Sequence, residues 1–228
     1  ASRTSPYVSK AVGAPLPGYA AQIAAGKTLA ELGFEEEPPV DGFFIKEVVL
    51  PFQKFPGVDA RLGPEMRSTG EVMGHASSFG HAFAKAQMAA NAPLPQSGTV
   101  LVSVNPYDVN AMVKLAHDLV KLGFKLRATV GTAQALAEAG ITAEVVRKPS
   151  EDSPTVIDSI RQGEIDLIIY TPRGGQSHAD GYAIRGAAVA YGVPIFTTLT
   201  GAAAAVQAIR SVRQKPLRVR SLQTHHWE

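Results

Sequence analysis

Two loops combine glycine with polar side chains where a strand is expected to give way to a helix, and the first of them can bind an anion. The first is Thr129-Val130-Gly131-Thr132. Backbone N–H groups, two hydroxyls and the dipole of the following helix can all face one anion there. Lys148, just past the next strand, can supply a positive charge. In the alternative interpretation, Thr132 only caps the helix and Thr129 only ends the strand.

The second loop, residues 171–178, is rich in glycine and polar residues but matches neither a Walker motif nor a dinucleotide fingerprint. Only His178 among the six histidines lies in a candidate loop, and no His, Asp or Glu spacing indicates a metal site. Glu151 and Asp152 precede an expected helix over 155–161, so helix capping explains them. With no cysteine in the chain, thiolate chemistry is excluded. The residues therefore predict binding and no catalytic or metal site.

The elements that position these loops follow a regular pattern. Apolar, β-rich runs at 99–104, 124–128, 143–146, 165–170 and 193–196 alternate with helical patterns. Strands of this kind, joined by helices, predict an α/β fold with a doubly wound, five-stranded parallel sheet. Ligands of such sheets bind beyond the carboxyl ends of the strands, where both loops lie. The glycines that end the helical patterns and favour left-handed caps are Gly123, Gly140, Gly163 and Gly192.

Residues 1–92 follow a different pattern, and the proline-rich stretch 91–98 predicts a linker to the domain at 98–228. Periodicity predicts helices at 19–32 and 77–90 and a strand at 43–50. Residues 51–74, crowded with charges, show no clean period and are expected to form an ordered loop or a short helix. Such a segment is a poor independent core, so we expect the incomplete α+β tail of a larger domain. A short strand is expected at 217–222.

Composition limits the partners. The 22 basic and 20 acidic residues are mixed along the chain, so no basic stripe indicates nucleic-acid binding. No apolar run approaches the roughly 18 residues that a membrane span needs. The lack of cysteine fits a reducing, cytoplasmic compartment. Because the chain opens at Ala1 without an initiator Met or an apolar leader, we expect a processed chain or a piece of a longer one.

Four runs in the first part of the chain carry a family resemblance. They are Val8-Ser9-Lys10-Ala11, Lys46-Glu47-Val48-Val49-Leu50-Pro51-Phe52, Lys54-Phe55-Pro56-Gly57-Val58-Asp59 and Leu62-Gly63-Pro64-Glu65-Met66-Arg67-Ser68-Thr69-Gly70-Glu71-Val72-Met73-Gly74. These runs resemble the end of the large chain of carbamoyl phosphate synthases. The resemblance covers essentially the whole chain: up to about Asn91 it resembles the close of the second ATP-grasp half, and from Gly98 the methylglyoxal-synthase-like regulatory domain.

The resemblance implies a ligase that makes carbamoyl phosphate from bicarbonate, glutamine-derived ammonia and two ATP, for arginine and pyrimidine synthesis. It implies ATP with magnesium or manganese as cofactors, a glutaminase small chain and the rest of the large chain as partners, and possible self-association. Arg3 falls on an arginine that contacts the nucleotide phosphates. The family's metal ligands lie before the matching region, so this fragment alone is expected to hold no catalytic residue and no metal.

The resemblance also implies two effector sites. Glu47 and Thr197 match positions that bind ornithine in enteric-type members, although Ile195-Phe196 replaces an aromatic-acidic pair. The positions that surround a uridylate or inosinate phosphate are matched by Thr129, Thr132 and Lys148.

Three other positions of the nucleotide pocket differ from the family pattern. Val109 replaces a lysine, and Tyr170 and Pro172 replace an asparagine and a threonine. Arg173 or Arg185 could compensate for the lost cation.

Two other functions fit the same predicted fold. One is a free-standing lyase like methylglyoxal synthase, although that family's Asp-Pro after the fourth strand is Thr171-Pro172 here. The other is an interaction scaffold whose pocket binds no effector.

Overall fold

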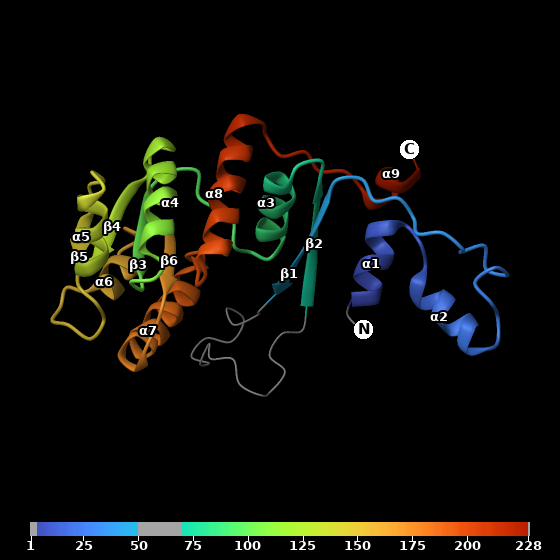
Figure 1. Cartoon of the computed structure of the whole chain (residues 1–228), viewed down its shortest axis with the longest axis horizontal. Coiled ribbons are helices and arrows are strands. Elements are labelled where there is room, and N and C mark those ends of the chain that lie inside the picture. The colour runs from blue at the N-terminus through green and yellow to red at the C-terminus, as the bar shows by residue number, and fades with distance from the viewer. Residues whose placement is uncertain (1–3, 50–69, 228) are drawn as a thin grey trace.

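The computed structural model describes residues 4–49 and 70–227, except for the side chains of 175–177 and 225–227. Five parallel strands form one sheet in the spatial order β5-β4-β3-β6-β7 (Figure 1). The chain winds outward from the central strand β3 in both directions, which confirms the predicted doubly wound α/β fold. The strands are β3 (Thr99–Val104), β4 (Lys125–Thr129), β5 (Glu144–Val146), β6 (Leu167–Thr171) and β7 (Ile195–Phe196).

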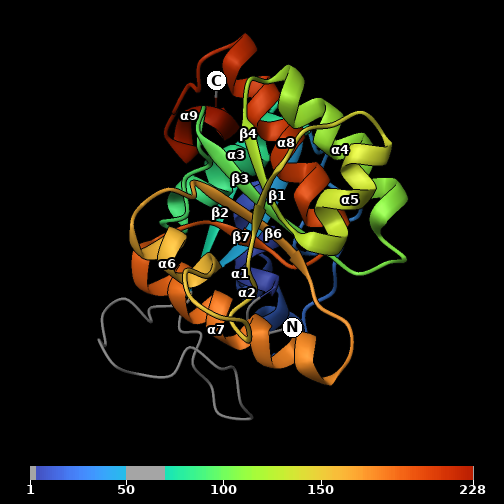
Figure 2. The same cartoon turned by 90° about the vertical axis from the view of Figure 1, so that its left-hand side faces the viewer.

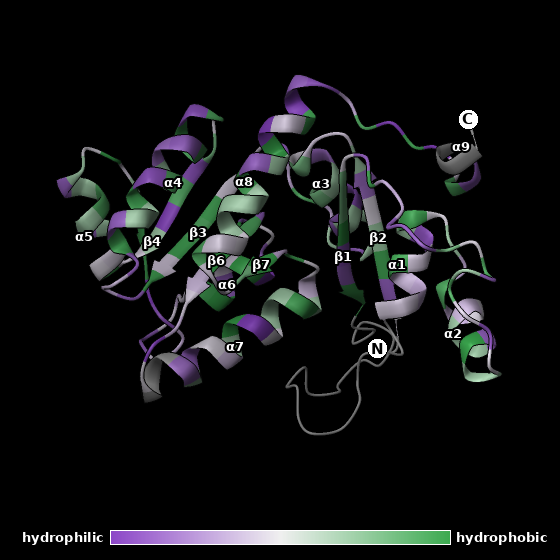
Figure 3. Cartoon of the chain, turned by 45° about the vertical axis from the view of Figure 1, so that its right-hand side comes forward, coloured by the Kyte–Doolittle hydropathy of each residue, from purple (hydrophilic) through white to green (hydrophobic). Residues whose placement is uncertain are grey.

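Helices cover both faces of this sheet (Figure 2). Because side chains alternate along a strand, Val100 and Val102 of β3 pack in one helical layer and Leu101 packs in the other. Figure 3 shows β3 as largely hydrophobic, as expected of a strand that is covered on both sides. One layer is formed by α4 (Val109–Lys121), α5 (Val130–Glu138) and α8 (Leu199–Gln214), and the other by α6 (Val156–Arg161) and α7 (Gly175–Tyr191).

The predicted glycine caps are confirmed. The φ angles of the four glycines lie between 69° for Gly192 and 77° for Gly123. Only a residue without Cβ adopts this left-handed backbone at low cost, so each glycine ends a helix and turns the chain toward the next strand.

The region before this sheet contains an antiparallel pair of strands, β1 (Phe43–Val49) and β2 (Gly70–Ala76), and the helix α3 (Phe79–Ala89). The expected loop or short helix over 51–74 is wrong for residues 70–74, which belong to β2; residues 51–69 lie outside the described part. The glycines of β2 weaken its sequence signal. Gly74 is nevertheless required, because a Cβ there would meet the Ala82 carbonyl oxygen and, at 2.5 Å, the Ala86 nitrogen.

The first helices differ from the prediction. Helix α1 (Thr4–Val12) was not expected, and α2 (Leu16–Ala24) ends well before residue 32. Gly26, with φ 102°, breaks the helical path. A new turn then starts at Thr28, whose N–H donates to the Glu31 carboxylate at 2.8 Å while the Glu31 N–H donates to the Thr28 hydroxyl at 3.3 Å. These reciprocal bonds form a capping-box pattern that begins a separate turn.

The strand expected at 217–222 is also wrong. Residues 216–221 are irregular and lead into α9 (Leu222–Trp227). Val219 is 78% exposed, so this segment has no buried face that would order it as a strand. Within the described residues, no helix is both long and apolar enough to cross a membrane.

Helix α3 joins the N-terminal region to the five-stranded domain. It lies between α8 and the β1–β2 pair (Figure 1). A Cβ on Gly80 would meet the Ser211 hydroxyl and, at 2.9 Å, the Gln207 carbonyl oxygen of α8. Farther along α3, the rings of Phe83 and Phe196 lie 6.3 Å apart. The division of the chain at residues 92–98, an irregular segment after α3, stays a prediction.

Arg127 of β4 links β5 and the turn before β6 through ion pairs. Its guanidinium forms ion pairs with Glu144 of β5, at 2.8 Å, and with Glu164, in the turn before β6. The hydrogen bond from Arg127, and then the positive charge of this guanidinium, hold the pKa of Glu164 below its ordinary value of 4.5.

Gly74→Ala tests the contact between β2 and α3. We expect it to lower the free energy of unfolding by about 1–3 kcal/mol, because the new methyl group meets backbone atoms. Gly186→Ala, on α7, is the matched control. The added Cβ meets nothing within 4 Å, so we expect the free energy of unfolding to rise by about 0.5–1 kcal/mol, because alanine favours a helix over glycine. Urea unfolding measures both. Equal stability of the two variants would contradict the packing argument.

Glu164→Gln tests the ion pair at the sheet edge. A carboxyl group whose pKa is lower in the folded chain stabilises the fold above its unfolded pKa and loses this effect as the pH falls through the folded value. We therefore expect the variant to melt at a lower temperature than the native chain at pH 7, with the difference shrinking once the pH falls below the ordinary value of 4.5 and disappearing below the lowered pKa of the folded chain. Glu138→Gln, an exposed change on α5, serves as the control. A difference that persists at low pH would rule out the ion pair as its source.

Candidate functional site

Hydroxyl side chains gather at the carboxyl ends of β3, β4 and β6. Thr129 and Thr171 end β4 and β6, Ser103 is the last residue but one of β3, and Thr132 lies in the first turn of α5. All four are at most 9% exposed. The Thr129 hydroxyl donates to the Ser103 oxygen at 3.0 Å. The Val104 N–H donates to the Thr132 oxygen at 3.2 Å, which leaves the Thr132 proton for another acceptor. We call these four residues the hydroxyl cluster.

The start of α5 faces open space beside this cluster. Thr129 is the N-cap residue, with φ −67° and ψ 154°, and its side chain makes no capping hydrogen bond. The interpretation that Thr132 is the N-cap is therefore wrong. Gly131 follows one residue into the helix, and a Cβ there would meet nothing within 4 Å. An anion could approach the first N–H groups of α5, at the positive end of the helix dipole.

Lys148 lies on the same edge of the sheet. The register pairs Thr129 with Val146, and Lys148 follows two residues later with an exposed side chain. The carboxylate of Glu151 accepts the Lys148 N–H at 2.8 Å and so shapes this loop.

The acidic residues of this loop do not cap the next helix as expected. The N-cap of α6 is Thr155, which forms a capping box with Asp158. Glu151 instead caps the turn that begins at Lys148, and the Asp152 carbonyl oxygen accepts a hydrogen bond from Arg147.

Asn105 was missed in the sequence. Its side-chain N–H groups donate to Asp108, at 2.6 Å, and to the Thr171 hydroxyl, at 3.1 Å. Its backbone N–H donates to the same hydroxyl at 3.2 Å. These bonds tie the loop after β3 to the end of β6. The feature of the sequence that could have indicated this role is an asparagine at the start of a loop, because its side-chain oxygen commonly accepts the backbone N–H two residues later. Here Asn105 accepts the Tyr107 N–H at 3.0 Å.

Two further contacts bring charge to this edge. The guanidinium of Arg173, after β6, lies 4.0 Å from the centre of the Tyr107 ring, which is itself 75% exposed. On the neighbouring loop, the Ser150 hydroxyl donates to Asp180 of α7 at 3.2 Å, and Asp180 is buried. The site therefore presents one fixed guanidinium at its rim and one buried carboxylate behind it.

The positions that differ from the family pattern surround the same edge. Val109 is the first residue of α4, and Pro172 directly follows β6. Tyr170 is 4% exposed and packs in the layer formed by α6 and α7, where a Cβ on Gly181 would approach its ring to 2.9 Å. Arg3, expected to contact ATP, lies outside the described residues.

The other predicted pair lies at the junction around α3. The Gln87 amide of α3 donates to the Glu47 carboxylate of β1 at 2.8 Å. One turn earlier, Phe83 contacts Phe196, which precedes the exposed Thr197. The structure thus places Glu47 and Thr197 beside the same face of one helix. In the part of the chain that the structure describes, no group of three or more His, Asp or Glu residues could hold a metal ion.

Comparison of the sequence with known proteins identifies similar families and relatives. A family model described as "MGS-like domain" matches residues 111–197. "Carbamoyl phosphate synthase large chain" of Synechocystis sp. is 52% identical over 99% of this chain, which covers 21% of that relative. The protein of the same name from Nostoc sp. is 50% identical over 99% of this chain and 20% of its own.

A shorter relative indicates which part of the large chain this sequence matches. "Carbamoyl phosphate synthase large chain, C-terminal section" of Methanopyrus kandleri is 50% identical over 99% of this chain and 43% of its own length. The chain therefore spans about a fifth of the full large chains that it matches and under half of this section. It carries an MGS-like domain and corresponds, over almost its whole length, to the C-terminal part of carbamoyl phosphate synthase large chains.

Proposed function

We propose that this chain is the regulatory end of a carbamoyl phosphate synthase large chain. The whole protein is a cytoplasmic, glutamine-hydrolysing ligase that uses ATP with magnesium or manganese and works with a glutaminase small chain. It supplies carbamoyl phosphate to arginine and pyrimidine synthesis. This part binds effectors and holds no catalytic residue. The names of the relatives and the MGS-like domain support the proposal.

The observation that carries the regulatory role is the position of α3. This helix packs against α8 of the MGS-like domain through Gly80, against β2 through the backbone beside Gly74, and against β1 through Gln87. A change at the strand ends of the domain can reach the ATP-grasp side only through packed elements, and α3 is one that contacts both. Interfaces packed this closely move as units, so a small shift is passed on.

A phosphorylated effector binds at the hydroxyl cluster. Its phosphate accepts hydrogen bonds from the first N–H groups of α5 and from the free proton of Thr132, while Lys148 neutralises charge. Thr129 fixes the start of the helix by donating to Ser103. Arg173, against Tyr107, supplies a second cation and takes the place of the lysine that Val109 replaces.

An amino-acid effector with a second amine, such as ornithine, binds at the junction. Glu47 is half-buried, and Gln87 orients its carboxylate at 2.8 Å. A partly desolvated carboxylate attracts an ammonium group more strongly than an exposed one does. The exposed Thr197, after β7, offers a hydroxyl to the effector from the other side.

The lyase alternative is less well supported. A lyase of the methylglyoxal synthase type has a carboxylate where Thr171 stands, and the Thr171 hydroxyl accepts two hydrogen bonds from Asn105. Phosphate release from dihydroxyacetone phosphate would favour the lyase instead.

Lys148→Gln tests the nucleotide site. Calorimetric titration with uridylate and inosinate should show saturable binding that the variant weakens about 10- to 100-fold, because one charge-assisted hydrogen bond is lost. Lys121→Gln removes an exposed lysine from the last turn of α4 and should leave binding unchanged. The site is excluded if neither nucleotide saturates, or if both variants behave alike.

Glu47→Gln tests the amino-acid site. The glutamine keeps the shape of the side chain but loses the negative charge, so ornithine affinity should fall about tenfold or more. Glu138→Gln on α5 removes one exposed carboxylate far from α3 and should have no effect. Unchanged ornithine binding in Glu47→Gln would place the effector elsewhere.

A further inference from the structure

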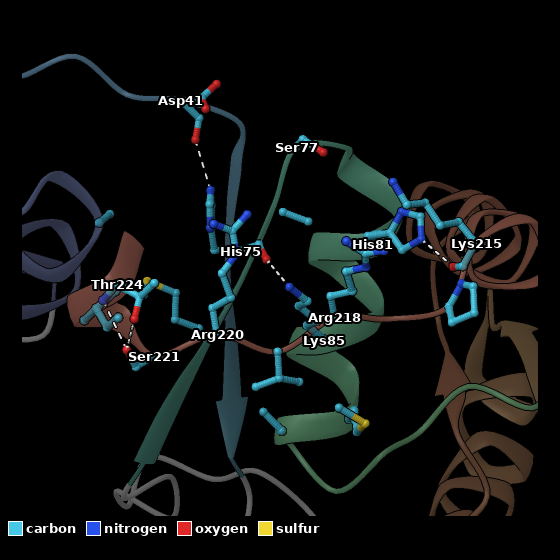
Figure 4. A pocket seen from close by; sticks show the side chains of 18 of the residues that line it. Asp41, His75, Ser77, His81, Lys85, Lys215, Arg218, Arg220, Ser221 and Thr224 are labelled. Carbon is cyan, nitrogen blue, oxygen red and sulfur yellow. Dashed lines mark hydrogen bonds between the residues drawn. The ribbon is translucent and has the colours of Figure 1, made fainter. Parts of the chain in front are cut away.

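A separate cavity of 1140 Å³ lies on the side of α3 away from the effector sites. Its walls come from α1, β2, α3 and the irregular tail before α9 (Figure 4). Neither the predicted nucleotide site nor the predicted ornithine site includes any residue that lines it.

Positive charge dominates the polar side of this cavity. Lys85 enters from α3, and Lys215, Arg218 and Arg220 enter from the tail; Asp41 is the acidic residue in the lining. None of the ion pairs among the described residues includes one of these four cations. Like charges held together around a concave surface attract an anion from solution.

Lys85 has the least solvated charge of this group. Its ammonium donates to the His75 carbonyl oxygen at 2.8 Å, which fixes its position on the cavity wall. Partial burial lowers its pKa, and the nearby charge of Arg220 lowers it further. A bound anion would favour the charged form of Lys85 and so oppose both effects.

The rest of the lining suits a ligand that carries apolar atoms as well as an anionic group. Ala11, Val12 and Met73 form apolar wall, and the hydroxyls of Ser221 and Thr224 border it. Sites for small organic ligands measure about 300–1,000 Å³, and this cavity of 1140 Å³ is slightly larger, so it has room for an organic molecule. Guanidinium groups match the oxygen pairs of phosphate.

We propose that this cavity binds a small organic phosphate, with Lys85, Arg218 and Arg220 around the phosphate and the apolar wall against the carbon skeleton. Lys215, Arg218 and Arg220 lie in the tail, so a bound phosphate holds residues 215–221 against β2 and α3. The site shares no residue with the nucleotide and ornithine sites proposed above.

Titration of the 228-residue chain with ribose 5-phosphate tests the site. Lys148→Gln is used as the background, so that binding at the nucleotide site is weakened. Amide spectra should show saturable shifts in β2 and the tail, with α5 unchanged, and inorganic phosphate should bind at least tenfold more weakly.

Charge-removing variants complete the test. Lys85→Gln keeps a donor for the His75 carbonyl, and Arg218→Gln/Arg220→Gln changes only exposed tail residues; each should weaken binding at least tenfold. The matched control, Lys114→Gln/Lys121→Gln, removes two exposed lysines from α4 and should not. Non-saturable shifts, equal binding of inorganic phosphate, or native affinity in both cavity variants would overturn the proposal.

Discussion

The close approach of α3 to its neighbours is the constraint on which the structure depends. Two glycines make it possible: Gly74 lets the α3 backbone lie directly on β2, and Gly80 lets α3 lie directly on α8. Atoms at such distances leave no room for even one methyl group, so α3 cannot shift without moving both neighbours. The two parts of the chain each contain their own sheet, but through α3 they share one packed interface.

The five-stranded sheet imposes a second constraint, at its carboxyl edge. Strand ends there would leave polar groups buried, and the hydroxyl cluster together with Asn105 satisfies them; no buried side-chain nitrogen or oxygen among the described residues lacks a partner. The same bonds fix the start of α5 and the loop after β3. The edge is therefore organised before any ligand arrives, which lowers the entropy cost of binding.

Local chemistry explains which features could be predicted from the sequence. Buried strands and glycine caps follow from runs of apolar residues and from backbone sterics, so the parallel sheet was predictable. β2 was not, because Gly70 and Gly74 weaken its pattern, and the need for Gly74 is explained only by its contact with α3. The end of α2 depends on the Thr28–Glu31 bonds, which compete with a continuing helix. In the site, Thr129 and Thr132 were identified by spacing, whereas the cation cluster around Lys85 joins residues about 130 positions apart, which no local pattern can show.

Helix α3 presents different chemistry on its different sides. Phe83 and Gln87, one turn apart, face the junction with β1 and β7. Lys85, between them in sequence, points to the basic cavity and the tail. A ligand on either side acts on the same rigid element, whose position the glycine contacts fix relative to α8. A rotation of α3 that improves one set of contacts must therefore change the other, so ligands bound at the two proposed sites, the cavity and the junction, would be coupled through this one helix.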